Sequence, residues 1–216
     1  ALEHYLNASW QICNAHDALM RPITTKYAIS SNGTTAIMDM ASAAGLTLLS
    51  SEERNPMLTT TFGVGEMLKD AISKGCKHIL LGIGGSATND AGIGMLAALG
   101  VKFYDNHKRE VTPIGKNLKL ISSVDLSKII SLKTITIDVI CDVTNPLYGP
   151  NGAAHVYAKQ KGANSTEIIE LDNGLRHFAT LCTTNPNTRG AGAAGGLGYA
   201  LLSLNANLKN LSLIHI

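Results

Sequence analysis

Apolar residues recur along this chain in short blocks that alternate between strand-like and helix-like spacing. Residues 79–83 form an apolar run bounded by glycines, which predicts a buried parallel strand. Apolar residues at helical spacing then predict a helix over residues 91–99. By the same patterns we expect strands at 34–38, at 101–105 and within 129–143, and helices at 38–46, 62–74, 167–180 and from 195 onward.

This alternation, with glycine-rich loops after strands, predicts the fold class. Strands and helices in turn are typical of an α/β fold with a mainly parallel sheet and flanking helices. Ligands of such sheets bind at the carboxyl ends of the strands. Functional residues are therefore expected in the loops that follow predicted strands.

The loop after residues 79–83 is the first candidate site. Gly84 and Gly85 allow the main chain to approach a ligand closely, and the polar residues after them can cap a helix start, where free N–H groups bind anions. The candidate anion-binding residues are Gly84, Gly85, Ser86, Ala87, Thr88 and Asn89, and Asp90 is a further residue able to cap the helix. Alternatively, the loop only turns the chain and caps the helix. No GxxxxGK[ST] occurs, which argues against a standard P-loop nucleotide site.

A second candidate follows the predicted strand within 129–143. Asp142 leaves an apolar run, where an α/β enzyme places a metal-binding carboxylate or a general base. Alternatively, Asp142 bonds only the backbone of the Asn145-Pro turn that follows. Lys159 and Lys161 could neutralise phosphate charge, but they are equally well explained as ordinary surface lysines. We expect Cys141 to be buried as a small hydrophobic residue.

The third candidate is a glycine-rich run at residues 190–198, preceded by Arg189. It contains GxGxxG, but no predicted strand precedes it and no acid follows at the expected distance, so a dinucleotide fingerprint is weakly supported. An NAD(P)-dependent oxidoreductase nevertheless stays open as an alternative. The glycines, Gly192, Gly195 and Gly196 among them, also allow a helix start to approach an anion or a facing domain, and Arg189 could contact a carboxylate or phosphate.

Composition narrows the function classes further. The 216 residues are 45% hydrophobic and 16% charged, which suffices for a sizeable core. A net charge of +2 with scattered Lys and Arg argues against nucleic-acid binding, and the short, interrupted apolar runs argue against a membrane span. Four widely spaced cysteines and isolated histidines match neither a zinc cluster nor a disulfide framework, so we expect a cytoplasmic protein with reduced thiols.

Several long motifs of this chain resemble those of a known family. GIGGSATNDAGIGMLAALGV closely resembles the signature of the glycerate kinase family, and further matches follow in the family's order: RNP from residue 54, TTFGVGE from 60, CDVTNPLYGPNGAAHVYAKQKGA from 141 and GAGAAGGLGYAL from 190. The resemblance covers residues 25–207. It implies a flavodoxin-like domain plus part of a second α/β domain, with an active site in the cleft between them.

The same resemblance implies a chemistry. Family members transfer the γ-phosphoryl group of ATP, with Mg²⁺, to D-glycerate, and the 2-hydroxyl is the favoured acceptor. We therefore expect Asp90 and Asp142 to be catalytic, as base or Mg²⁺ ligand, with Asp142 favoured as the metal ligand. Besides the loop at 84–89, the expected substrate- and phosphate-binding residues are Asn145, Arg189, Gly192, Gly195 and Gly196.

The chain also departs from the family. Asp-Ser-Phe-Lys-Gly, Ala-Asp-Gly-Gly-Glu-Gly and Thr-Gly-Glu-Gly type segments find no match in it. We therefore expect an internal fragment, with an atypical segment at 1–24, a core at 25–207 that is incomplete at both ends, and a non-native tail at 208–216. Such a fragment is expected to lack appreciable kinase activity alone, and a non-catalytic remnant remains an alternative. The oligomeric state, including a homo-oligomer, stays open.

Overall fold

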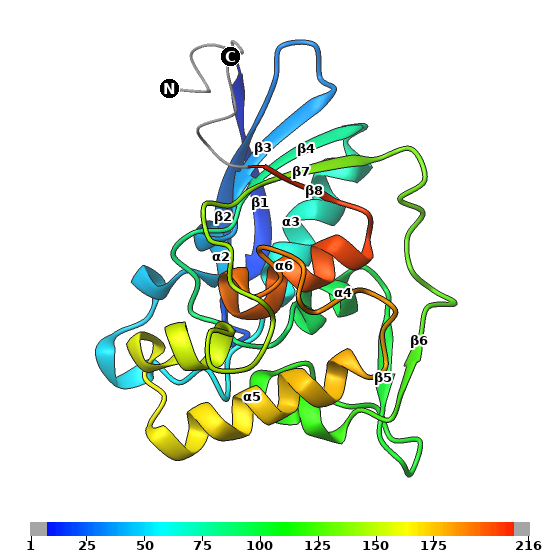
Figure 1. The fold of residues 1–216 in the computed structure, drawn as a ribbon. Coiled ribbons are helices and arrows are strands. Elements are labelled where there is room, and N and C mark those ends of the chain that lie inside the picture. Colours follow the sequence, from blue (N-terminus) through cyan, green and yellow to red (C-terminus); the bar gives the residue numbers. More distant parts are fainter. Residues whose placement is uncertain (1–7, 210–216) are drawn as a thin grey trace.

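A computed structural model describes residues 8–209, in which strands and helices alternate (Figure 1). The strands are β1 (Ser9–His16), β2 (Pro22–Ile29), β3 (Thr35–Asp39), β4 (His78–Gly82), β5 (Lys102–Tyr104), β6 (Ser123–Asp125), β7 (Thr136–Ile140) and β8 (Asn207–Lys209). The α-helices are α2 (Ala41–Ala44), α3 (Phe62–Ser73), α4 (Ile93–Ala98), α5 (Ser165–Ala179) and α6 (Ala193–Ser203). Short 3₁₀ helices lie at Leu46–Leu48, Ser51–Glu53, Gly115–Leu120 and Lys159–Lys161, and a π-helical turn lies at Ala154–Ala158.

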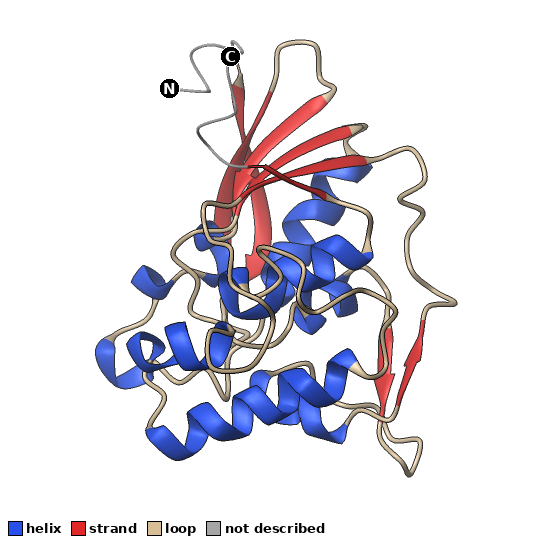
Figure 2. Cartoon of the chain, viewed as in Figure 1, coloured by secondary structure: helices blue, strands red, loops and turns tan. Residues whose placement is uncertain are grey.

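One mixed sheet organises the described residues. Its order is β1-β2-β3-β4-β7-β8, and the last four of these strands run parallel (Figure 2). One face of the central strands is buried in the core through alternate residues such as Ile79, Leu81 and Val139. The α/β fold with a mainly parallel sheet and flanking helices is therefore confirmed.

The register of the central strands explains where a site can form. Gly82 at the end of β4 lies opposite Asp39 at the end of β3 and Ile140 at the end of β7. The glycine-rich loop and the segment with Asp142 therefore leave the sheet side by side. Two motifs separated by more than fifty residues meet at one edge, as expected for parallel strands.

The edge hairpin of β1 and β2 is an element that the sequence patterns did not predict. Its strands pair antiparallel over eight residues, and the Asp17 carboxylate closes the turn by accepting hydrogen bonds from the backbone N–H groups of Leu19 and Arg21. Only one face of β1 is buried, through Cys13 and Ala15, while Trp10 and Ile12 are exposed. Exposed apolar residues blur the alternation that would otherwise indicate a strand.

Other expected elements differ in extent. Within 129–143 only β7 is a strand, and the predicted helix at 38–46 is reduced to the four residues of α2. The strand expected at 101–105 is β5, which pairs with β6 outside the main sheet. Helix α3 agrees closely with the prediction, and Gly75 follows it with a φ of +94°. Residues 1–7 and 210–216, which include most of the predicted tail at 208–216, lie outside the described residues.

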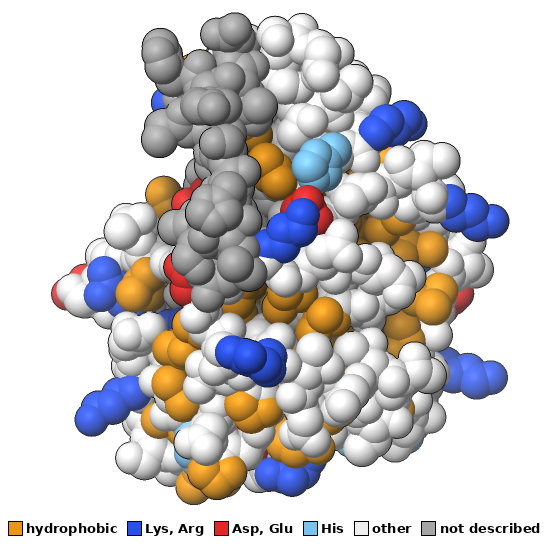
Figure 3. Space-filling model, turned by 45° about the horizontal axis from the view of Figure 1, so that its top comes forward, with side chains coloured by type: hydrophobic (Ala, Val, Ile, Leu, Met, Phe, Trp, Pro, Cys, Tyr) orange, Lys and Arg blue, Asp and Glu red, His pale blue; other side chains and the backbone are white. Residues whose placement is uncertain are grey.

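The charged surface, the helix lengths and the cysteines bear on three further expectations. Lys and Arg side chains are spread over the face drawn in Figure 3 and form no continuous basic patch there. No helix within residues 8–209 is long and apolar enough to cross a membrane. The four cysteines are all free thiols. Cys141 is only half-buried, so its expected place in the core is wrong in part.

Candidate functional site

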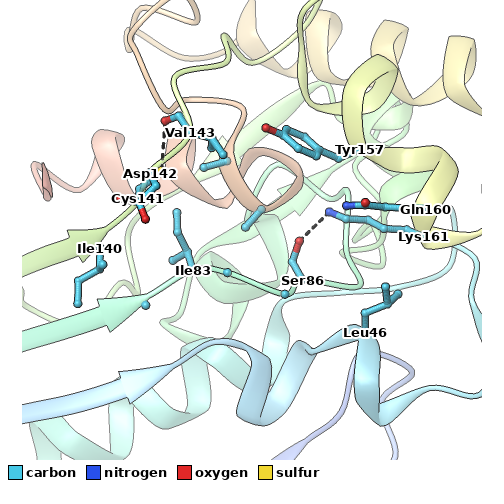
Figure 4. Close-up of a pocket in the computed structure, with 15 residues that line it drawn as sticks. Leu46, Ile83, Ser86, Ile140, Cys141, Asp142, Val143, Tyr157, Gln160 and Lys161 are labelled. Atoms are coloured by element: carbon cyan, nitrogen blue, oxygen red, sulfur yellow. Dashed lines mark hydrogen bonds between the residues drawn. The ribbon is translucent and has the colours of Figure 1, made fainter. Parts of the chain in front are cut away.

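A pocket of about 440 Å³ lies where β4 and β7 end. The loop at 82–86 and the segment at 140–143 supply most of its wall, and Tyr157, Gln160 and Lys161 approach from the other side (Figure 4). Leu46 and the alanines at 193 and 194 complete the lining. Three of the motifs quoted above therefore converge on one cavity.

The Gly84–Ser86 loop presents its backbone to this pocket. Its neighbours hold it in place, because Leu46 N–H donates to the Gly85 carbonyl and Ala87 N–H donates to the Ala44 carbonyl. Gly85 has a φ of +67°, a conformation that glycine adopts without steric strain. Within the part of the chain that the structure describes, the N–H groups of Gly84, Gly85 and Ser86 donate to no backbone carbonyl. Successive free N–H groups of this kind form a concavity suited to an anion.

Lys161 reaches the loop from a short 3₁₀ helix. Its ammonium nitrogen Nζ lies 2.6 Å from Ser86 Oγ and 2.7 Å from the Thr88 carbonyl oxygen, and the residue is 2% exposed. Burial lowers the pKa of Lys161 to about 7, and the charge of Asp90 opposes this effect only in part. Of the two interpretations given for Lys161, that of an ordinary surface lysine is therefore wrong, because the residue is buried.

The depressed pKa of Lys161 predicts a pH-dependent stability. The unfolded lysine has a pKa of about 10.4, so between about pH 10 and 7 the unfolded chain holds the proton more tightly than the folded one. Stability should therefore fall as pH falls through this window, by on the order of 1 kcal/mol per pH unit, and level off below about 7. Urea unfolding near pH 9, 8 and 7 should show this slope in the wild type and not in Lys161→Met.

Lys159→Met is the matched control, because Lys159 lies on the same short helix and is exposed. It should retain the wild-type slope. Equal slopes in wild type and Lys161→Met would show that Lys161 titrates as an ordinary lysine.

The opposite wall of the pocket carries Asp142. Asp142 is exposed and lies beside Cys141 and Val143, just beyond β7 (Figure 4). Burial raises the pKa of the Cys141 thiol, which donates to the Val143 carbonyl, so the thiol is not activated as a nucleophile. Among the described residues that line the pocket, Asp142 is the acidic one.

Asn145 supports the pocket indirectly. Its side-chain oxygen accepts a hydrogen bond of 2.7 Å from Tyr157 Oη, and its amide nitrogen donates to the Asn151 carbonyl. Tyr157 lies in the π-helical turn, a feature that often marks functional sites. Asn145 thus orients a wall residue rather than lining the cavity itself.

Asp90 lies elsewhere than its expected role as a base requires. It is fully buried, and its carboxylate accepts hydrogen bonds from Thr61 N–H, Thr61 Oγ1–H, Gly92 N–H and Gly94 N–H, at 2.7 to 3.2 Å. Burial raises its pKa, and these hydrogen bonds oppose the rise. The carboxylate joins the start of α3 to the start of α4, so the N–H groups of Gly92 and Gly94 already have an acceptor within the protein.

The remainder of the signature loop is also buried. Ala87, Thr88 and Asn89 are at most 1% exposed and do not line the pocket. Among residues 8–209, Thr88 Oγ1 and both amide atoms of Asn89 have no hydrogen-bond partner. Only Gly84, Gly85 and Ser86 of the expected anion-binding residues face the cavity.

The glycines at 195 and 196 serve contacts within the protein. A Cβ at Gly195 would lie 2.0 Å from the Thr88 carbonyl oxygen, and one at Gly196 would lie 2.8 Å from Ala91 Cα. Gly192 likewise packs on the Pro146 carbonyl. Of the two alternatives stated for these glycines, close approach to a facing protein segment fits the structure, whereas none of the three lines the pocket.

The glycine run at 190–198 does not have the structural context of a dinucleotide-binding fingerprint. Helix α5 and a loop precede the glycine run, whereas a dinucleotide fingerprint follows a strand. Residues 194–196 have left-handed φ values of 51°, 69° and 93°, so the regular part of α6 begins only after them. Arg189 is exposed and does not line the pocket.

Sequence patterns alone did not single out Tyr157, Gln160, Ile83 or Ile140 as pocket residues. Two of these residues could have been predicted, because Ile83 and Ile140 end the two apolar runs that lead to the site. Tyr157 and Gln160 belong to a quoted motif, but nothing in their spacing indicates that they face residue 86. Within residues 8–209 no group of three or more His, Cys, Asp or Glu side chains could hold a metal ion.

Comparison with known proteins agrees with these motifs. The Glycerate kinase family profile matches residues 1–214. The chain is 43% identical over 198 residues to a glycerate kinase of Bacillus subtilis (strain 168), which covers 88% of this chain and 52% of the relative. It is 44% identical over 195 residues to a glycerate 2-kinase of Escherichia coli (strain K12), which covers 87% and 51%.

A solved structure shows the same fold. The crystal structure described as "putative glycerate kinase 2 from Salmonella typhimurium LT2" superposes with a TM-score of 0.92 at 35% identity, and covers 96% of this chain and 57% of that one. The chain spans about half the length of the curated relatives it matches. With a profile match over nearly all its residues, the chain belongs to the glycerate kinase family.

Proposed function

We propose that this chain binds nucleotide and substrate in an ATP-dependent glycerate kinase, which phosphorylates D-glycerate to phosphoglycerate. The observation that carries the proposal is the convergence of three family motifs around one cavity at the carboxyl edge of the sheet: the motif with Ser86, the motif with both Asp142 and Lys161, and the motif with Ala193 and Ala194. The name glycerate 2-kinase of the Escherichia coli relative supports 2-phosphoglycerate as the product.

The pocket has the groups that phosphoryl transfer needs. This reaction depends on positioning and charge neutralisation more than on covalent chemistry by the protein. The Gly84–Ser86 loop, whose N–H groups donate to no backbone carbonyl among residues 8–209, and Lys161 line one side of the cavity, and Asp142 lines the other. Donors for phosphate or carboxylate oxygens therefore lie opposite an acid that can hold a metal or accept the proton of the substrate hydroxyl.

Mg²⁺ fits this donor set. It usually keeps several waters and is bound through one or two carboxylates together with substrate phosphates, so a cage of protein ligands is not required. Asp142 is an exposed carboxylate at the pocket and is the proposed ligand. When bound, Mg²⁺ would neutralise charge on the transferred phosphate.

Asp142→Asn should raise the Mg²⁺ requirement of ADP binding by about tenfold or more, because a neutral amide is a poor ligand for a hard cation. Isothermal titration of ADP at a series of Mg²⁺ concentrations would measure the shift. Metal-free ADP should bind both proteins alike. Asp125→Asn, a change in β6 outside the pocket, is the control. An unchanged Mg²⁺ dependence in Asp142→Asn would leave Asp142 as the proposed base instead.

Binding and turnover test the function itself. ADP and D-glycerate should each bind the chain in isothermal titration, and ADP release should depend on D-glycerate wherever turnover occurs. Binding without turnover would match a non-catalytic remnant, whereas binding of neither ligand would overturn the proposal. A nicotinamide fluorescence titration should show no binding, which separates the kinase from the oxidoreductase alternative.

The site also suggests where the protein works. ATP as the phosphoryl donor and the four free thiols together support a cytoplasmic location.

A further inference from the structure

Lys161 is a buried amine whose charged form would have no buried counter-ion in contact. Its two hydrogen-bond partners, Ser86 Oγ and the Thr88 carbonyl oxygen, are both neutral. Burying a charge is costly unless an opposite charge accompanies it. Lys161 lines the pocket together with the Gly84–Ser86 loop, whose N–H groups donate to no backbone carbonyl among residues 8–209, so an anion bound there would lie beside both.

The charged groups around Lys161 do not fill that role. Asp90, from the start of α4, is near enough to raise the pKa of Lys161, but its carboxylate is engaged by Thr61, Gly92 and Gly94. Asp142 faces the pocket from beyond β7. Cys141 and Tyr157 have pKa values raised by burial, and the backbone of Arg54 packs against Gly162, next to the lysine.

We propose that Lys161 and the Gly84–Ser86 amides form a subsite for a tetrahedral dianion, and that Lys161 takes up its proton when this dianion binds. An ammonium has three donors, and Ser86 and Thr88 accept two of them, which leaves one for the ligand. In the glycerate kinase proposed above, on which this identification rests, the dianion would be a phosphate group of the nucleotide or of the product.

The titration behaviour supports this coupling. With its pKa lowered to about 7, the amine is mostly neutral in the empty site above that pH. A bound dianion favours the charged form, so binding and protonation must strengthen each other. The same reasoning argues against Lys161 as a general base, because the anionic ligands of the pocket would keep it protonated during the reaction.

Sulfate is the suitable probe, because it is a tetrahedral dianion that does not titrate near neutral pH. In isothermal titration at constant ionic strength, its affinity for the wild-type chain should weaken at least about tenfold from pH 7 to pH 9. Lys161→Arg, charged throughout, should bind with little pH dependence, and Lys161→Met should bind weakly at every pH. Lys159→Met should behave as the wild type.

A second measurement needs no variant. The ¹³C-detected titration of the Lys161 ε-methylene should give a higher pKa with saturating sulfate than without it. No sulfate binding by the wild type, pH-independent affinity, or unchanged binding in Lys161→Met would each overturn the subsite. Lys161-dependent sulfate binding without ADP or D-glycerate binding would sustain the subsite and count against the kinase. ADP binding that is unchanged in Lys161→Met would support the kinase and count against the subsite.

Discussion

Gly195→Ala should destabilise the protein by about 3 kcal/mol or more and weaken ligand binding. The new Cβ would lie 2.0 Å from the Thr88 carbonyl oxygen and 2.6 Å from Asn89 Cα, and both are backbone atoms that cannot rotate away. Gly195 also has a φ of +69°, which costs an alanine about 1 kcal/mol before any overlap. Because the Thr88 carbonyl accepts from Lys161, a shift of this backbone would disturb the pocket. Urea unfolding and sulfate titration would measure both effects.

Gly33→Ala is a matched control for this change. Gly33 has a φ of +72°, close to that of Gly195, but a Cβ there would meet nothing within 4 Å. It should lose only the conformational cost, about 1 kcal/mol, and bind sulfate as the wild type does. Equal losses in the two variants would mean that the contact between the glycine run and the signature loop adds nothing to stability.

Asp90→Ala should lower the unfolding free energy by about 3–5 kcal/mol, because four buried donors lose their carboxylate acceptor. For a chain of this size the loss corresponds to a fall in Tm of roughly 6–20 °C. The unfolding free energy of Asp90→Asn should lie between those of Asp90→Ala and the wild type, because the amide keeps one acceptor oxygen. Thermal and urea unfolding would give these values.

Asp125→Ala serves as the comparison. Asp125 accepts a hydrogen bond from Ser127 N–H in an exposed turn, and its removal should cost less than about 1 kcal/mol. The outcome also decides the role of Asp90. A general base would lose turnover in Asp90→Asn while the protein kept its wild-type stability, which is the opposite of what its buried position predicts.

Much of the fold and the family could be predicted from local pattern. The apolar runs that became β4 and β7 and the helical spacing that became α3 and α5 are short-range signals, and they survive because each element buries one face. The edge hairpin was missed, since β1 exposes Trp10 and Ile12 and so lacks a clear alternation.

For the candidate site, the sequence by itself determined which loops meet at the pocket: the residues after β4, those after β7, and the family's motifs. Only the tertiary structure decided which side chains of those loops face the pocket. Asp90 and Ser86 look alike in the sequence, as polar residues of one loop, but one is enclosed by Thr61 and the other lies beside Lys161. Burial and charge pairing depend on residues that are distant in sequence, here 29 and 75 positions away, and no local spacing encodes them.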